Sequence, residues 1–231
     1  MGDLVFYAAS QAYYCDLRNA FPKKGVESLG ELFHDFNIPV TWLTNPEGAK
    51  KGKEIFTQFR EEFGDDVILW CQPVFGSPRK MRDVALKMGE GEIRRFIREE
   101  QCRLKKVLPF AKVDHIGYFY RTMPAIRAMR SLRIKSCYGH SWEMVNTDGV
   151  TDKGVPWGFY YIDANESWKK PAQKRYDVGK NKIGIIANQG LQHDFNKIWN
   201  SHGSSRVFSF DPNAVERSRI CRSDNIEYWK G

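Results

Sequence analysis

Short apolar runs alternate with amphipathic segments along most of this chain, and this alternation constrains the fold more than any single motif. Runs rich in Val, Ile, Leu, Phe, Tyr and Trp, typical of β-strands, occur at residues 4–8, 38–43, 67–71, 115–120, 134–138, 158–162 and 183–187. Between them lie segments with apolar residues three and four positions apart, the spacing of a helix that buries one face. These segments are residues 26–36, 50–63, 79–108 and 124–132. The segment 79–108 is expected to be broken near residues 89–91.

Strands that alternate with helices predict a parallel sheet covered by helices. About seven such units without an evident linker favour an α/β fold of one particular kind, a parallel (β/α) barrel of about seven strands that forms a single domain over residues 1–231. A doubly wound α/β sheet is the alternative. The tail at residues 211–231 has no evident closing element, which is consistent with the N-terminal part of a longer protein.

Charge and composition exclude several classes of partner. The formal net charge is +8, but the basic residues are interleaved with apolar and acidic ones, as on solvated helix faces, and no nucleic-acid-binding signature occurs. We therefore expect no nucleic-acid partner. No apolar run is long enough to cross a bilayer, and no signal-type segment follows Met1, so we expect no membrane partner and a cytoplasmic location, unless a leader has been removed.

Five dispersed cysteines, with no close pair, argue against both a disulfide framework and a structural zinc site. Cys71 and Cys137 lie inside apolar strand-like runs and are expected to be small core residues. Cys137 lies three positions before His140, so a nucleophilic role is conceivable, although the spacing does not favour it over burial.

The candidate functional residues follow the predicted strands, because barrels of this kind carry their chemistry where strands lead into the next helix. The carboxylates Glu143 and Asp148 could form the acid and base pair that cleaves a glycosidic bond. His140 and His193 could act as general bases or as metal ligands, and Asp194, which follows His193, could orient an imidazole. The expected catalytic set is Asp148, Glu143, His140 and Asp194.

Polar and aromatic residues in the same regions suit a carbohydrate ligand, since sugar rings stack on aromatic faces while acids and amides bind hydroxyls. Arg121 could bind a carboxylate or orient a catalytic acid through its planar fork, or form an ion pair at the barrel rim. The expected substrate-binding set is Arg121, Trp142, Trp157, Tyr160 and Gln189.

Each candidate also has a structural interpretation. A lone acid is commonly solvated, aromatic residues in a barrel are commonly core, and a histidine is commonly hydrogen-bonded in place. Asp194 could instead cap the helix predicted at 195–199. His34 lies on an amphipathic helix and His202 beside Gly203 in a loop, and neither is counted as functional.

The segment Tyr120-Arg-Thr-Met-Pro124 resembles the arginine-x-proline motif of the polysaccharide deacetylase superfamily, and Trp142 lies where a tryptophan often follows it. Further similarity is to an uncharacterised bacterial branch of glycoside hydrolase/deacetylase-like domains. The matching positions are Gly139 with Trp142, Asp148-Gly149, Tyr160-Tyr161, Lys170-Pro-Ala-Gln173 and Asp194-Phe195. The resemblance implies a barrel of about seven strands that acts on carbohydrate.

The chain departs from that superfamily at its metal site. Metal-dependent deacetylases carry adjacent aspartates after the first strand and two histidines after the third. Here the first region contains Ser10-Gln11 and Cys15-Asp16, and the third strand ends in Trp70-Cys-Gln-Pro73. We therefore expect no bound metal and no other cofactor. The expected function is hydrolysis of a polysaccharide or glycan, and the alternative is a catalytically inactive barrel that binds glycan.

Overall fold

The computed structural model describes residues 8–14, 21–71, 84, 87–117 and 122–139, together with four later strand segments. The strands are β1 Ala8–Gln11, β2 Val40–Thr44, β3 Asp66–Trp70, β4 Lys112–Gly117, β5 Ser136–Gly139, β6 Gly158–Tyr161, β7 Gly184–Ala187, β8 Gln189–Gly190 and β9 Phe208–Ser209. The helices are α1 Lys23–His34, α2 Pro46–Lys51, α3 Lys53–Phe63, α5 Glu90–Val107 and α6 Met123–Ser131. These elements confirm the predicted α/β class.

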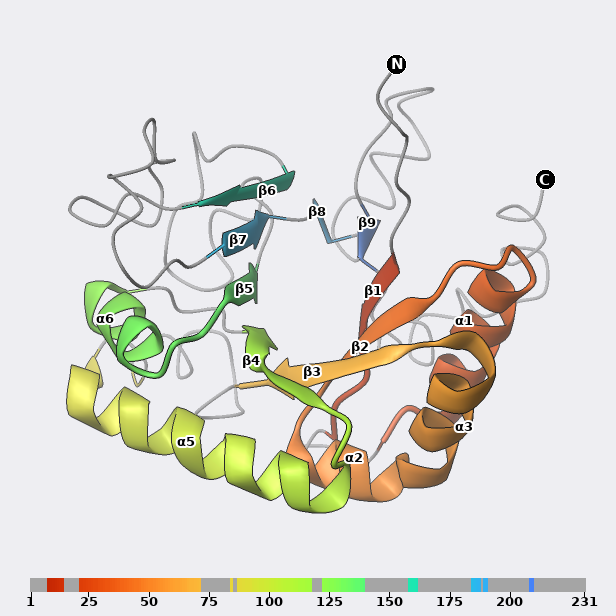
Figure 1. The fold of residues 1–231 in the computed structure, drawn as a ribbon, viewed down its shortest axis with the longest axis horizontal. Coiled ribbons are helices and arrows are strands. Elements are labelled where there is room, and N and C mark those ends of the chain that lie inside the picture. The colour runs from red at the N-terminus through yellow and green to blue at the C-terminus, as the bar shows by residue number, and fades with distance from the viewer. Residues whose placement is uncertain are drawn as a thin grey trace.

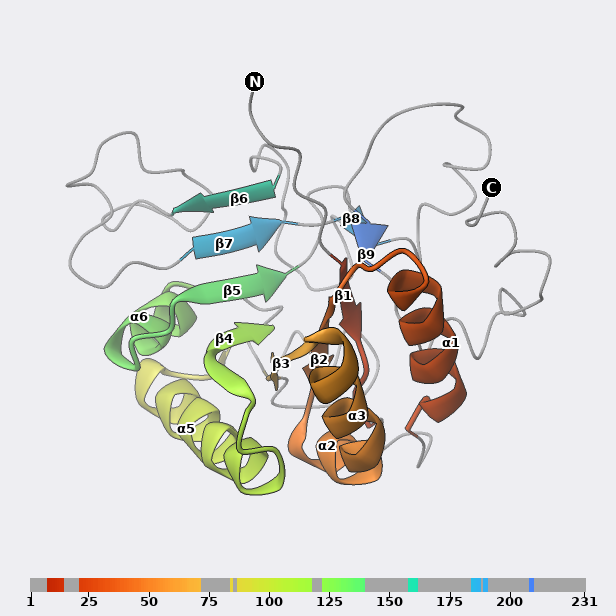
Figure 2. The same cartoon turned by 45° about the vertical axis from the view of Figure 1, so that its right-hand side comes forward.

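One seven-stranded sheet, in the order β1-β2-β3-β4-β5-β7-β6, organises the molecule. Every neighbouring pair from β1 to β7 is parallel, with Gln11 beside Leu43 and Cys137 beside Ile185 as examples of the register. Figures 1 and 2 show the helices as an outer layer along one face of this curved sheet. The predicted parallel sheet with helices outside it is therefore confirmed.

The last strand of the sheet corrects one expectation. The sequence pattern predicted residues 158–162 as a further parallel strand, but β6 pairs antiparallel with β7, with Tyr160 beside Ile185. Parallel neighbours require a long crossover connection, normally helical, whereas antiparallel neighbours do not. The sequence of residues 140–157 lacks helical periodicity and therefore predicts no crossover helix ahead of this strand.

The sheet is open between β1 and β6 as far as the described residues extend, so barrel closure is not established. β8 follows β7 after one residue and pairs with β9, and β9 contacts β1. Figures 1 and 2 show β8 and β9 between β7 and β1.

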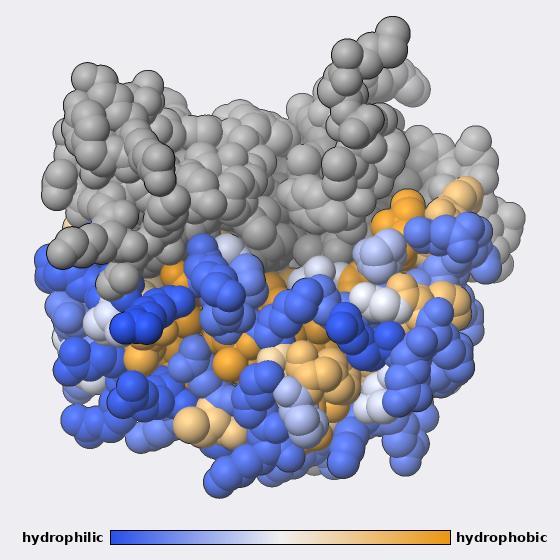
Figure 3. Space-filling model, in the orientation of Figure 1, coloured by the Kyte–Doolittle hydropathy of each residue, from blue (hydrophilic) through white to orange (hydrophobic). Residues whose placement is uncertain are grey.

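The side chains on both faces of β2 and β3 are largely buried, as expected for strands between two layers. Toward the helices, Trp42, Leu69 and Cys137 join one apolar cluster with Phe56 and Ile97. Leu43, Ile68 and Trp70, at alternate positions, are also buried but lie on the opposite face. The charged and polar side chains of the helices cover most of the described surface in Figure 3, and apolar side chains show between them.

Helix boundaries follow local chemistry. Asn45 caps α2 by accepting a hydrogen bond from the Gly48 backbone at 2.9 Å, and Pro46 occupies the first turn, where its missing N–H costs nothing. α5 begins after Gly89, whose N–H donates to Glu92 at 2.8 Å, so the break predicted near residues 89–91 is confirmed. No helix among the described residues is long and apolar enough to cross a membrane.

Candidate functional site at the carboxyl ends of the strands

The carboxyl ends of the parallel strands meet at one edge of the sheet, which is where folds of this kind place their ligands. β1, β2, β3, β4 and β5 end at Gln11, Thr44, Trp70, Gly117 and Gly139. The residues that follow these strands therefore share one edge, here called the carboxyl edge. Their chemistry determines what this part of the molecule can bind.

An aromatic stack joins β1 to β3 at the carboxyl edge. The rings of Tyr13 and Trp70 lie 5.5 Å apart, centroid to centroid, with only 16° between their planes. Trp70 is buried and Tyr13 half-buried. Gly117 makes room for the indole, because a Cβ at this position would lie 2.5 Å from a Trp70 ring atom and 2.7 Å from Leu43. The tyrosine is thus supported from below by a fixed tryptophan.

Asn45 connects two loops at the same edge. Its side-chain oxygen accepts hydrogen bonds from the backbone N–H groups of Tyr14 and Gly48, both at 2.9 Å, and its amide donates to the Tyr14 carbonyl at 3.0 Å. Thr44 beside it is buried. Asn45 thus follows a strand, but its side chain serves to hold the residues after β1 in place.

Cys71 and Cys137 both lie in the helix-facing core, which confirms their expected burial. Burial raises the pKa of the Cys71 thiol well above its ordinary value, and the nearby Glu100 carboxylate acts in the same direction. A buried thiol held in its neutral form is a poor nucleophile. The burial of Cys137 likewise argues against the nucleophilic role that its distance from His140 in the sequence allowed.

The described residues at the carboxyl edge do not fit the divalent metal that the superfamily resemblance implies. After β1 the structure describes Ala12, Tyr13 and Tyr14, and β3 leads through Trp70 into buried Cys71. The sequence has no histidine between His34 and His115. Among the described residues, no group of three or more His, Cys, Asp or Glu side chains is arranged to hold a metal ion. No step of the mechanism is therefore assigned to a metal.

Most of the sequence-predicted site lies outside the described residues. This applies to the catalytic candidates His140, Glu143, Asp148 and Asp194 and to the binding candidates Arg121, Trp142 and Trp157. Tyr160 and Gln189 are placed only by their backbone, Tyr160 in β6 beside Ile185 and Gln189 in β8 beside Phe208. Their convergence on one site remains a prediction.

The opposite, amino edge of the sheet contains a buried polar network that the sequence interpretation missed. One Asp65 oxygen accepts from the Val40 backbone at 2.8 Å and from His34 Nε2 at 3.0 Å, and the other accepts from Trp42 Nε1 at 2.7 Å. Asp65 is 1% exposed. A buried carboxylate needs such partners, so this network has a structural role. His34 was set aside as an ordinary helix residue, and its distance of 31 residues from Asp65 left no sequence signal.

A half-buried histidine lies at the same edge. His115 Nδ1 is 2.6 Å from Ser136 Oγ. Burial lowers the pKa of His115; the neighbouring Asp114 opposes this shift, while Lys135 and Lys112 add to it. Neutral imidazole is therefore favoured at this position.

No protein family model matches the sequence, and no curated protein matches it. Among solved structures, the fold is similar to a "putative polysaccharide deacetylase" from Mycobacterium smegmatis, with a TM-score of 0.51 and 11% sequence identity. The match covers 99% of this chain and 76% of that one. At this identity the similarity establishes a deacetylase-like α/β fold and nothing about activity.

Proposed function

We propose that this chain is a carbohydrate-active hydrolase of deacetylase-like fold whose ligand site is the carboxyl edge. The Tyr13–Trp70 stack is the observation that carries the proposal. It lies at the ends of β1 and β3, where the metal-dependent deacetylases carry their ligands, and aromatic faces are what sugar rings stack on. In this proposal β8 and β9 complete a barrel around the site.

Catalysis would then depend on carboxylates and histidine. Glu143 and Asp148 act as general acid and base at the scissile bond of a glycosidic linkage, with water as the attacking group, if their carboxyl groups lie far enough apart to admit that water, and the linkage is then inverted. A shorter separation would make one of the two carboxylates the nucleophile of a covalent intermediate that water then hydrolyses, with retention. His140 moves a proton, and Asp194 orients an imidazole. Arg121, Trp142, Trp157, Tyr160 and Gln189 hold the sugar.

A non-catalytic glycan-binding barrel is the second candidate function. The half-buried ring of Tyr13, supported by buried Trp70, is a rigid platform that can bind a sugar ring without any reaction. Under this alternative Tyr13 affects affinity, whereas Glu143 and Asp148 can be neutralised without consequence.

The test is an assay of acetylated and unmodified glycans, each with and without a chelator, on the unaltered protein and on Glu143→Gln and Asp148→Asn. Asp152→Asn, a neighbouring carboxylate outside the proposed machinery, is the matched control. We expect turnover that survives the chelator and falls at least about a hundredfold in both catalytic variants but not in the control. Chelator-sensitive deacetylation would contradict the metal-free mechanism, and binding without turnover would favour the glycan-binding alternative.

A further inference from the structure

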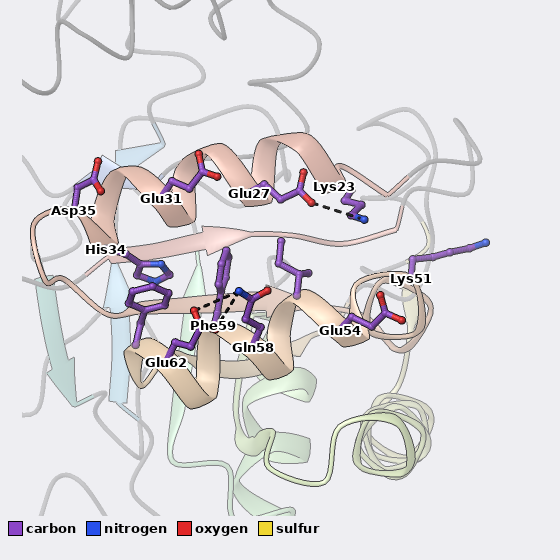
Figure 4. A pocket seen from close by; sticks show the side chains of 12 residues that line it. Lys23, Glu27, Glu31, His34, Asp35, Lys51, Glu54, Gln58, Phe59 and Glu62 are labelled. Atoms are coloured by element: carbon purple, nitrogen blue, oxygen red, sulfur yellow. Dashed lines mark hydrogen bonds and ion pairs between the residues drawn. The ribbon is translucent and has the colours of Figure 1, made fainter.

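A groove of about 470 Å³ lies between α1 and α3, on the outside of the molecule and away from the carboxyl edge. The helices approach closely because Gly30 has no side chain; a Cβ there would lie 2.4 Å from the ring of Phe59. Figure 4 shows the side chains of the two helices along both sides of the groove. The groove therefore runs between two helices that touch at Gly30 and Phe59.

Apolar side chains form the floor of the groove. Ile55 and Phe59 are buried, and Phe63 is 42% exposed. Phe63 and Phe36, which follows α1 by two residues, are the exposed large hydrophobic residues of the described part of the chain. Of these two, Phe63 lines the groove and Phe36 does not, so Phe63 is the exposed apolar side chain that the groove offers to a partner.

The walls of the groove are acidic, although the whole chain has a formal charge of +8. Five carboxylates, from Glu27, Glu31, Asp35, Glu54 and Glu62, face two lysines, Lys23 and Lys51. Glu27 pairs with Lys23 at 3.8 Å, and Glu62 accepts from Gln58. The side chains of Glu31 and Glu54, on opposite walls, make no hydrogen bond or ion pair with any residue that the structure describes.

A buried imidazole closes one end of the groove. The ring of His34 stacks on Phe63 at 3.7 Å between centroids, with 9° between the planes, and its side chain is only 4% exposed. Nε2 bonds Asp65, but Nδ1 is buried without a hydrogen-bond partner among the described residues. Asp65 and Phe63 therefore fix the imidazole at this end of the groove.

We propose that this groove is the docking site for a basic amphipathic helix of another protein. The apolar side chains of such a helix lie on Ile55, Phe59 and Phe63, and its lysine or arginine residues meet Glu31 on one wall and Glu54 on the other. Helices that bind in grooves use this combination of apolar anchors and flanking charge. The partner is expected to be positively charged, because the groove carries more carboxylates than lysines on a chain whose formal net charge is positive.

The test uses a labelled synthetic peptide of about four helical turns, with leucines on one face and lysines on the other. Fluorescence anisotropy measures its affinity for the intact protein. We expect Glu31→Gln with Glu54→Gln to weaken binding at least about tenfold at about 50 mM salt, and we expect the difference to shrink at about 300 mM. Glu61→Gln is the matched control, since Glu61 is exposed on α3 and does not line the groove.

Three outcomes would overturn the proposal. The first is equal affinity of the double variant and the unaltered protein, and the second is an equal loss in Glu61→Gln. The third is tight binding of a matched peptide with glutamates in place of the lysines. Light scattering of the protein alone adds a fourth: a dimer that the double variant dissociates would assign the groove to a second copy of this chain. None of these results depends on whether the protein hydrolyses glycans.

Discussion

At the amino edge of the sheet, one carboxylate collects three hydrogen bonds, whereas at the carboxyl edge two aromatic rings stack. Asp65 binds His34, Val40 and Trp42 within 3.0 Å, in a region without access to water. Tyr13 rests on Trp70 with part of its surface exposed. In the first arrangement the contacts are directional, and both oxygens of the Asp65 carboxylate already accept hydrogen bonds. The second leaves a surface that a ligand can still contact, which is why we assign the structural role to the amino edge and propose the binding role for the carboxyl edge.

The largest effect expected from this division is on folding, at the amino edge. Asp65→Ala leaves the Trp42 indole, the Val40 amide and the His34 imidazole buried without an acceptor. We expect a loss of about 3 to 5 kcal/mol in the free energy of unfolding, measured by urea denaturation. Asp65→Asn, which retains one acceptor oxygen, should lose less. If Asp65→Ala were as stable as the unaltered protein, the structural role assigned to the amino edge would be wrong.

The second effect is on packing below the aromatic stack. Gly117→Ala places a methyl group 2.5 Å from the Trp70 ring, so the indole must move and its contact with Tyr13 must change. We expect a loss of about 1 to 3 kcal/mol, together with an altered near-ultraviolet circular dichroism signal from the aromatic residues. Gly91→Ala, at a position where a Cβ meets no atom within 4 Å, is the matched control.

A smaller effect is expected outside the sheet, where Arg103 joins α5 to α2. It donates to Glu100 at 2.5 Å and to Glu47 at 2.7 Å. Burial raises the pKa of Glu100, and Arg103 opposes this shift. Arg103→Met should therefore cost about 1 to 2 kcal/mol at neutral pH.

The cost of Arg103→Met should also depend on pH. Without Arg103, the pKa of Glu100 in the folded state should rise further. Above about pH 4.5 the folded protein then retains a proton that the unfolded chain releases, so the loss of stability caused by Arg103→Met grows as the pH increases from 4.5. Urea denaturation at a series of pH values from about 4.5 upward measures this loss of stability. Arg95→Met, at an exposed position on the same helix, should change neither the stability nor its pH dependence.

The smallest effect concerns pH at the amino edge. The pKa of His115 is lower when folded than its ordinary value of 6.5, mainly because of burial. The unfolded state therefore binds the proton first, and this contribution to stability is complete above pH 6.5 and is lost as pH falls below it. Thermal unfolding between about pH 7.5 and pH 5 should show a shallow decline that is reduced in His115→Gln. If stability declined equally in His115→Gln and in the unaltered protein, His115 would not be the cause of the decline.

Each strand of the seven-stranded sheet overlaps a run predicted from sequence, although β1 does so only at Ala8, and most of the helices were predicted as well, because hydrophobic patterning reports which face of an element is buried. The short strands β8 and β9 were not predicted. α2 was missed because the helical spacing was recognised only from residue 50, although asparagine at the cap and proline in the first turn, here Asn45 and Pro46, also mark the start of a helix. The antiparallel direction of β6 was missed because strand patterning carries no direction.

The sites were harder to predict than the fold. The Asp65 network joins residues that are distant in the sequence, and no periodicity links them. The absence of deacetylase-type ligands after the first and third strands could be recognised from sequence, because it concerns residue types at strand ends. That Tyr13 and Trp70 stack at this edge could not, because the contact depends on how far β1 and β3 extend and on the space left by Gly117.

The central claim is that the carboxyl edge binds carbohydrate while the amino edge supports the fold. The most direct measurement is glycan affinity of Tyr13→Ala and Asp65→Asn, side by side, at a temperature where both are folded. We predict that Tyr13→Ala loses at least about tenfold in affinity, as expected for an aromatic stacking contact, whereas Asp65→Asn retains its affinity although it is less stable. Unchanged affinity in Tyr13→Ala together with lost affinity in folded Asp65→Asn would contradict the account.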